Sequence, residues 1–255
     1  MWDPTTYLRY GDERSRPFAD LLARVSAESP REVVDLGCGP GTLTAGLTDR
    51  WPDARIRGLD SSAEMISSAA GLGSGVTFEV ADVREWSPTA EVDVVLANAV
   101  LQWVPGHDAL LGRWVAALGT GRWLAFQVPG NFDAPSHRLL REVAARPAFR
   151  DRVGGLRDLS AVFEPTEYAA LLTAAGCAVD AWETTYVHLL AAEEPSHPVL
   201  AWLEGTALRP VRASLDDDAW ARYRAELSGL LDEAYPIRDG LVYFEFRRIF
   251  VVART

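Results

Sequence analysis

The chain of 255 residues carries a formal charge of −11, and all 25 of its cationic side chains are arginines. This length suits one domain with additions, and an apolar share of 48% suffices for a sizeable core. The acidic balance makes nucleic acid a poor partner, and the absence of lysine excludes a lysine Schiff base or a phosphate-loop lysine. Because the two cysteines lack zinc-binding spacing and no HExxH motif occurs, we expect no metal.

Targeting and membrane signals are missing from the sequence. No run approaches the roughly 18 apolar residues of a membrane span, and the first residues lack an apolar core with a basic flank. We therefore expect a cytoplasmic protein with no membrane partner.

Residues 1–30 predict a helical arm. Aromatic residues open it, and apolar residues then recur at helical spacing from Phe18 to Val25. Such an arm either packs on the outside of a sheet or covers the ends of its strands.

The stretch 33–41, Val-Val-Asp-Leu-Gly-Cys-Gly-Pro-Gly, predicts a buried strand that ends in a glycine turn. Residues 42–50 then predict a helix. A strand, a glycine turn and a helix in this order are typical of a nucleotide-binding α/β unit, because glycine lets the backbone approach a ligand closely. Asp35, two residues before the first glycine, suits a ligand that carries an ammonium group.

Acidic residues also end the next two predicted strands, 55–60 and 76–83. Asp60 lies nineteen residues after Gly41, a distance at which a carboxylate accepts hydrogen bonds from ribose hydroxyls. The Asp82 carboxylate is suited to accept a hydrogen bond from the exocyclic amine of an adenine. Three successive acids at strand ends therefore favour a nucleoside ligand.

The remaining elements alternate between helix and strand. Ser61 and Glu64 predict a capping box that opens a helix to about Ala70. The further elements expected are strands at 92–97 and 122–128, helices at 108–118 and 165–175, a strand at 179–190, helices within 195–236, and a closing strand at 241–253.

The acids and glycines of this pattern resemble the class I S-adenosylmethionine-dependent methyltransferases. Segments outside the cofactor motif resemble, more specifically, the trans-aconitate 2-methyltransferase family. These segments are 2–8, 13–17, 98–105, 175–186, 208–210 and 247–253.

The resemblance implies a Rossmann-like α/β fold: a seven-stranded, mostly parallel sheet with its last strand antiparallel, helices on both faces and a helical cap. It divides the chain into an arm at 1–30 that acts as a lid, a methyltransferase core at 31–194 and 237–255, and a cap at 195–236. The implied cofactor is S-adenosyl-L-methionine. The residues expected to bind it are Asp35, Gly37, Gly39, Gly41, Asp60, Ser61, Asp82, Val83, Asn98 and Trp103.

The expected reaction is methyl transfer to a carboxylate of trans-aconitate, which gives a monomethyl ester. A carboxylate with a pKa of ~4 is already ionised at neutral pH, so no catalytic base is expected and alignment dominates. Arginine is suited to hold the remaining carboxylates of a small polycarboxylate substrate. The residues expected to bind it are Tyr7, Tyr10, Arg14, Arg16, Gln102, Tyr186, His188, Arg209 and Arg247.

Alternatives remain open on the sequence alone. The same chemistry could serve another small carboxylic acid or a phenol, and only the acceptor pocket distinguishes these. A cofactor-binding module without catalysis is a third reading, which the intact Asp35, Asp60 and Asp82 argue against. NAD binding is a further alternative, but the sequence lacks the Gly-x-Gly-x-x-Gly order that is typical of it. A monomer is compatible with the sequence.

Overall fold

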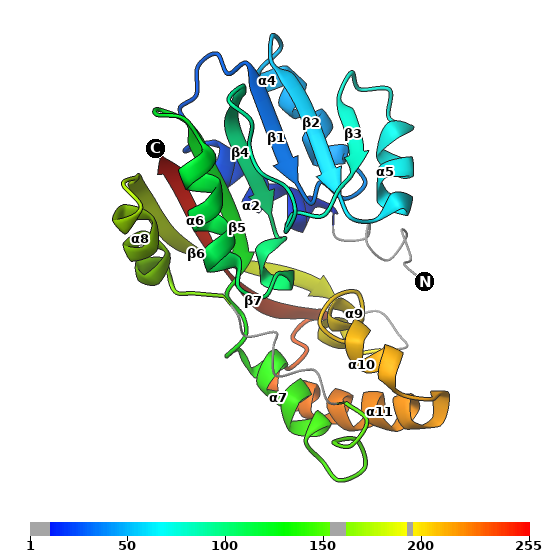
Figure 1. Ribbon diagram of the computed structural model, residues 1–255. Coiled ribbons are helices and arrows are strands. Elements are labelled where there is room, and N and C mark those ends of the chain that lie inside the picture. The colour runs from blue at the N-terminus through cyan, green and yellow to red at the C-terminus, as the bar shows by residue number, and fades with distance from the viewer. Residues whose placement is uncertain (1–10, 154–161, 193–195) are drawn as a thin grey trace. The chain divides into compact units, whose positions relative to one another are not determined.

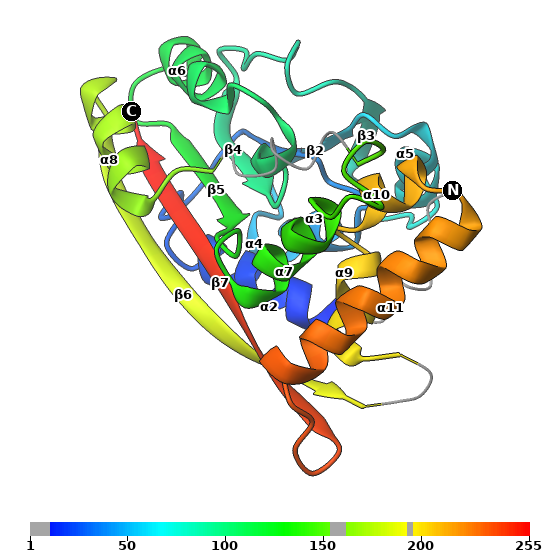
Figure 2. The same ribbon diagram turned by 90° about the horizontal axis from the view of Figure 1, so that it is seen from below.

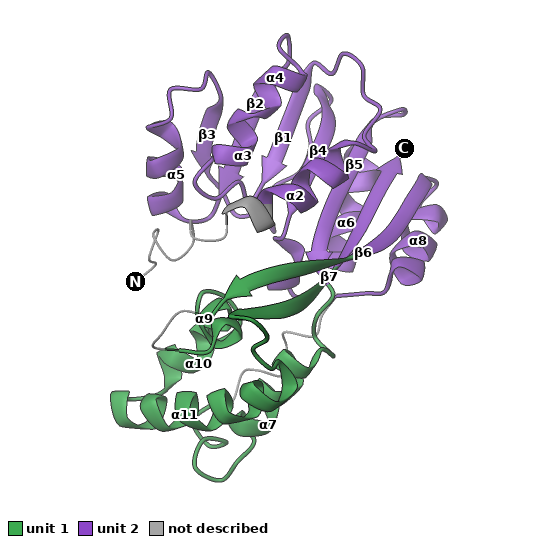
Figure 3. Ribbon diagram, turned by 180° about the vertical axis from the view of Figure 1, so that it is seen from behind, with its two compact units in different colours: residues 1–13, 130–160, 185–247 green, residues 14–129, 161–184, 248–255 purple. Residues whose placement is uncertain are grey.

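The computed structural model describes residues 11–153, 162–192 and 196–255, with side chains from residue 15 onward (Figure 1). These residues divide into two compact units, coloured separately in Figure 3. Among the described residues, the sheet unit comprises 14–129, 162–184 and 248–255, and the helical unit comprises 11–13, 130–153, 185–192 and 196–247. Each unit is described by itself.

Seven strands of the described chain form one sheet in the order β3-β2-β1-β4-β5-β7-β6. The pairs among the first five strands are parallel, and β7 is antiparallel to β5. The predicted fold class is therefore confirmed. The strands are β1 (Glu32–Leu36), β2 (Arg55–Asp60), β3 (Thr77–Val80), β4 (Val92–Asn98), β5 (Trp123–Pro129), β6 (Ala178–Ala191) and β7 (Leu241–Arg254).

Helices cover both faces of the sheet unit (Figure 2). On one face, α6 (His107–Ala117) and α8 (Pro165–Ala174) pack with inward residues of the central strands, such as Val34, Phe126 and Val251. The opposite face carries α2 (Gly11–Leu22), α3 (Thr42–Ala45), α4 (Leu47–Arg50) and α5 (Ala63–Ala70). Because β1 and β4 are covered on both faces, they are buried along almost their whole length, as central parallel strands are.

The helical unit holds the helices predicted between residues 195 and 236. They are α9 (Pro198–Glu204), α10 (Arg209–Ser214) and α11 (Asp217–Ala234), and α7 (Pro135–Ala144) joins them. Their core contains Leu140, Trp202, Tyr223 and Phe244, and the hydroxyl of Tyr223 donates to the carbonyl of Leu140 at 2.6 Å. This unit therefore has its own hydrophobic core.

Two local predictions were wrong. The helix predicted over 42–50 is two short helices, α3 and α4, because Gly46 interrupts it. The N-cap of α5 is Ser62 rather than Ser61: its Oγ accepts from the Met65 amide at 3.3 Å. The Asp60 carboxylate accepts from the Ser62 amide, and the chain therefore reaches the helix one residue later.

No helix of the described residues is long and apolar enough to cross a membrane. Within the same residues, no group of three or more His, Cys, Asp or Glu side chains could hold a metal ion.

Candidate functional site

The glycine turn after β1 has three residues with positive φ: Gly37 at 70°, Gly39 at 56° and Gly41 at 78°. A Cβ on Gly37 would lie 2.2 Å from Val100 Cγ2, and one on Gly41 would lie 2.7 Å from Ala69 Cβ. A Cβ on Gly39 would meet nothing within 4 Å. The outer two glycines are thus required by packing, whereas the middle one borders open space, as a cradle for a ligand does.

Asp35 lies buried on β1, directly before this turn. Its Oδ2 accepts from the Thr44 hydroxyl at 2.6 Å, and its buried Oδ1 has no hydrogen-bond partner among the described residues. Burial raises the pKa of Asp35 to about 7, and the nearby Asp60 charge adds to the effect. A cation placed beside Oδ1 would relieve this desolvation.

Asp60, at the end of β2, joins the glycine turn to the start of α5. One carboxylate oxygen accepts from the Gly39 amide at 3.0 Å, and the other accepts from the Ser62 amide at 2.9 Å. Each oxygen keeps a further lone pair, so the carboxylate is held in place and still able to accept. Ser61, which stands between Asp60 and Ser62 in the sequence, is exposed.

Asp82 follows β3, on the strand next to β2. The Arg84 amide and its guanidinium both donate to the carboxylate, with Nε at 3.0 Å from each oxygen. These bonds lower the pKa of Asp82 to about 2 and keep it ionised. Arg84 was not predicted as a site residue, although it stands only two residues after Asp82 in the sequence. Val83 is half-buried against the core around α6.

The chain turns sharply at the end of β4. Ala99 has φ 57°, unusual for a residue other than glycine, and its amide donates to the Gln127 carbonyl at 2.9 Å. The Gln102 side chain donates to the Ala99 carbonyl at 2.7 Å, while its buried Oε1 has no partner in the described part of the chain. Trp103 ends a short 3-10 helix, η1 (Leu101–Trp103), and is 51% exposed.

The structure brings most of the predicted cofactor residues to one edge of the sheet unit. The register pairs Asp35 with Leu96 and Leu36 with Ala97, so Asn98 comes level with the glycine turn. Asp60 and Asp82 follow on the next two strands of the order. This edge holds the carboxyl ends of the parallel strands, where α/β proteins bind ligands.

The predicted acceptor residues are more scattered. Tyr186 and His188 are buried on β6 with parallel rings, centroids 6.4 Å apart, and His188 also stacks on Trp202. Arg247 is half-buried on β7, whereas Arg209 begins α10 in an exposed position. Arg16 is exposed on α2. Tyr7, Tyr10 and the side chain of Arg14 lie outside the described residues.

One polar residue of the helical unit was not predicted. Asn131 is 2% exposed, and its Oδ1 accepts from the Arg247 amide at 2.6 Å. That bond leaves the buried Nδ2 as a donor without a partner among the described residues. A buried donor left unsatisfied costs about 1–3 kcal/mol, so an acceptor from a ligand is expected there. The sequence signal that could have pointed to Asn131 is the pair Pro129 and Gly130, which directly precede it and end the strand.

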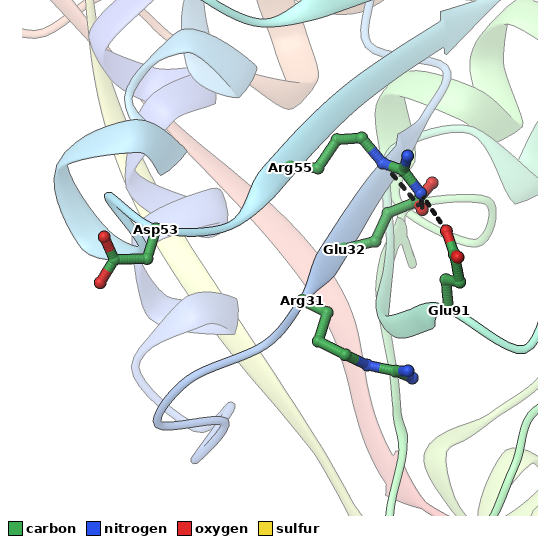
Figure 4. Close-up of a pocket in the computed structure, with 5 residues that line it drawn as sticks. All are labelled: Arg31, Glu32, Asp53, Arg55 and Glu91. Carbon is green, nitrogen blue, oxygen red and sulfur yellow. Dashed lines mark hydrogen bonds and ion pairs between the residues drawn. The ribbon is translucent and has the colours of Figure 1, made fainter.

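A pocket of about 340 Å³ lies at the opposite edge of the sheet unit (Figure 4). Glu32 and Arg55 line it from the amino ends of β1 and β2, and Arg31, Asp53 and Glu91 complete it. Arg55 bridges Glu32 and Glu91, as the dashed lines of Figure 4 show. Arg55 is thus engaged with two carboxylates of the pocket, and Arg31 pairs with Asp93 outside it. Because the pocket also faces away from the carboxyl ends of the strands, it is not the candidate site.

Comparison with known proteins agrees with this geometry. A family model described as a methyltransferase domain matches residues 10–181. A trans-aconitate 2-methyltransferase from Mycobacterium sp. (strain KMS) is 58% identical over all of this chain and all of its own length. Proteins of the same name from Rhodococcus jostii (strain RHA1) and Mycobacterium tuberculosis (strain ATCC 25177 / H37Ra) are 54% and 50% identical, each over all of this chain and over 100% and 97% of their own lengths.

Solved structures share the fold at low identity. The YcgJ protein of Bacillus subtilis has a TM-score of 0.59 at 12% identity, over 94% of this chain and 98% of its own. A Haemonchus contortus phosphoethanolamine N-methyltransferase, in complex with S-adenosylhomocysteine, has a TM-score of 0.53 at 15% identity, over 94% of this chain and 52% of its own. The full-length relatives decide the family: the chain belongs to the methyltransferases, and within them to the trans-aconitate 2-methyltransferase family.

Proposed function

We propose that this protein transfers the methyl group of S-adenosyl-L-methionine to a carboxylate of trans-aconitate and forms a monomethyl ester. The observation that carries the proposal is the buried Asp35 beside the open Gly39 turn, in a chain 58% identical over its full length to a protein of that name. An unpartnered carboxylate oxygen in this position fits the ammonium group of a methionine moiety.

The residues of the sheet unit fit the rest of such a cofactor. Asp60 retains lone pairs for two ribose hydroxyls, and Asp82, kept ionised by Arg84, is suited to an adenine amine. We assign the remaining contacts to residues at the same edge: Gly37, Gly39, Gly41, Ser61, Val83, Asn98 and Trp103. When bound, the cofactor supplies a methyl group on a positively charged sulfur.

The acceptor needs little activation by the protein. A carboxylate oxygen would take the methyl group with its own lone pair, and the cofactor would supply that methyl group from its sulfonium and be left as a neutral thioether. No proton moves, so a catalytic base is not required. The task of the chain is then to align the acceptor and to exclude water.

The overall charge of −11 repels a trianion, so attraction to the acceptor has to be local. We propose that the anion is held by arginines and neutral donors, with Arg14, Arg16, Arg209 and Arg247 as the cationic candidates. Asn131 joins them as a buried donor that a carboxylate oxygen would satisfy. The remaining proposed acceptor contacts are Tyr7, Tyr10, Gln102, Tyr186 and His188.

The test is a methyl-transfer assay over di- and tricarboxylic acids and phenols, with the product identified by mass spectrometry. A methyl ester is cleaved by mild alkali and releases methanol, whereas a phenol ether survives. We expect trans-aconitate to give an alkali-labile monomethyl product at the highest kcat/KM. An alkali-stable product, or a larger kcat/KM for another acceptor, would overturn the proposed substrate.

A further inference from the structure

Three side chains of the sheet unit form a polar ladder across the carboxyl edge of the sheet: Asn98 on β4, Gln127 on β5 and Arg248 on β7. Gln127 Nε2 donates to Asn98 Oδ1 at 2.6 Å, and Arg248 Nη1 donates to Gln127 Oε1 at 3.3 Å. Gln127 is 1% exposed and Arg248 is 6% exposed. Residues 121 positions apart in the chain thus share one buried contact.

The chemistry of the ladder sets the orientation of both amides. A guanidinium carries only donors, so Gln127 has to present its oxygen to Arg248. The amide nitrogen of Gln127 then donates to Asn98, which accepts this hydrogen bond with its Oδ1. The order of donors therefore leaves Asn98 Nδ2 directed away from the ladder, where no protein group of the described chain accepts from it.

The position of Asn98 in the sheet indicates which kind of ligand group its Nδ2 would contact. The pairing of β1 with β4 brings Asn98 level with the glycine turn, and Asn98 is half-buried. The next residue, Ala99, has positive φ and is tied back to β5 by its amide, so the end of β4 is held in place. An N–H donor fixed at this edge suits an anionic group of a bound ligand.

We propose that Arg248 is a positioning residue that acts through Gln127 to keep Asn98 as an N–H donor to a carboxylate. This inference rests on the proposed function for the identity of the ligands. The carboxylate belongs either to the acceptor or to the methionine moiety of the cofactor. In both cases the role assigned to Arg248 is to orient the Asn98 amide through Gln127.

The variant Gln127→Glu inverts the ladder. A glutamate still accepts from Arg248, but it presents a second oxygen to Asn98, whose amide then has to turn and donate to it. The oxygen of Asn98 would now face the ligand carboxylate. Gln127→Met is the matched control. It removes the hydrogen bonds of Gln127 with Asn98 and with Arg248, so neither orientation of the Asn98 amide is imposed. Asn98→Asp keeps the bond from Gln127 and replaces the outward donor with a carboxylate oxygen.

Calorimetry measures binding of S-adenosylhomocysteine, and then binding of trans-aconitate to protein saturated with S-adenosylhomocysteine. Methylthioadenosine, which lacks the methionine carboxylate, serves as the reference ligand. For one of the two carboxylate ligands we expect a loss of about 3- to 10-fold in Gln127→Met and of about 30-fold or more in Gln127→Glu and Asn98→Asp. Methylthioadenosine binding should stay within about twofold of the wild-type value.

Loss confined to S-adenosylhomocysteine assigns the donor to the cofactor, and loss confined to trans-aconitate assigns it to the acceptor; both support the proposal. If the ladder only supported the sheet, Gln127→Glu would be milder than Gln127→Met because it keeps the bond to Arg248. That order, or unchanged binding of both ligands, would overturn the inference. The wild-type methylation assay tests the proposed function separately, because these binding measurements need no turnover.

Discussion

Asp35→Asn tests whether the fold stores an unfavourable charge at the site. Asp35 is wholly buried, and only one of its oxygens has a partner among the described residues. Its pKa is 3.8 in the unfolded chain and about 7 in the folded protein, so folding favours the neutral form. Well below pH 3.8 both states are protonated, and the free energy of unfolding is not affected by this group. As the pH rises toward 7, the unfolded state ionises first, and the free energy of unfolding falls.

The magnitude follows from those two pKa values. Between about pH 5 and pH 8 the carboxyl group lowers the free energy of unfolding by about 2 to 3 kcal/mol. Asparagine keeps an oxygen for the Thr44 hydroxyl and does not ionise, so any cost of its own is independent of pH. Urea denaturation of both proteins without ligand, at about pH 5 and pH 8, gives the difference. We expect Asp35→Asn to gain about 2 to 3 kcal/mol relative to the wild type over this range.

Ligand binding should show the opposite preference. An ammonium group beside Asp35 favours the ionised form, so wild-type affinity for S-adenosylhomocysteine should rise more than tenfold between about pH 5.5 and pH 7. The asparagine variant should bind weakly, with no such rise. Parallel stability curves for the two proteins would refute the raised pKa. A steep rise in affinity that survives in Asp35→Asn would refute the contact with the ammonium group.

Three further predictions concern other parts of the site. Gly39→Ala should lose about 1–2 kcal/mol of stability because of its positive φ, and at least about tenfold in cofactor affinity. Gly41→Ala should lose more stability, because its Cβ would lie 2.7 Å from Ala69 Cβ. Thermal unfolding compares the stabilities of the two variants, and calorimetry compares their cofactor affinities. Asn131→Asp keeps the bond from the Arg247 amide but removes the donor, so the KM for trans-aconitate should rise about tenfold while cofactor affinity stays constant. With both substrates saturating, kcat should be flat between about pH 6 and pH 8, and a steep rise through pH 7 would instead indicate a base such as His188.

Local patterns predicted most of the fold. The apolar runs of β1 and β4, and the glycines between β1 and α3, are properties of consecutive residues, and the structure confirms the strand–turn–helix unit that they indicate. The acids at strand ends were visible for the same reason. The roles of Asp60 and Asp82 toward ribose and adenine stay predictions, because these roles concern a ligand rather than the chain.

What the sequence could not show depends on contacts between distant segments. The Gln127–Arg248 contact requires the order of the sheet, in which the last strand lies beside the fifth. The unsatisfied donor of Asn131 depends on the Arg247 amide, 116 positions later. The positive φ of Ala99 has no residue signal, because glycine or asparagine is the usual occupant of that conformation. Such features arise from tertiary packing, which periodicity does not encode.

The ion pairs at the amino edge of the sheet bear on how the strands find their alignment during folding. Glu32, 1% exposed, accepts from Arg55 and from Arg57, which alternate along β2 and therefore share one side of it. A slip of β2 by one residue would place Ile56 opposite Glu32 and leave a buried carboxylate without its partners. Because losing the partner of a buried charge costs about 3–5 kcal/mol, the misaligned sheet is penalised more than the native one is stabilised. The two arginines thus select one alignment of the central strands, and we expect Arg57→Leu to populate misaligned states during refolding before it measurably weakens ligand binding.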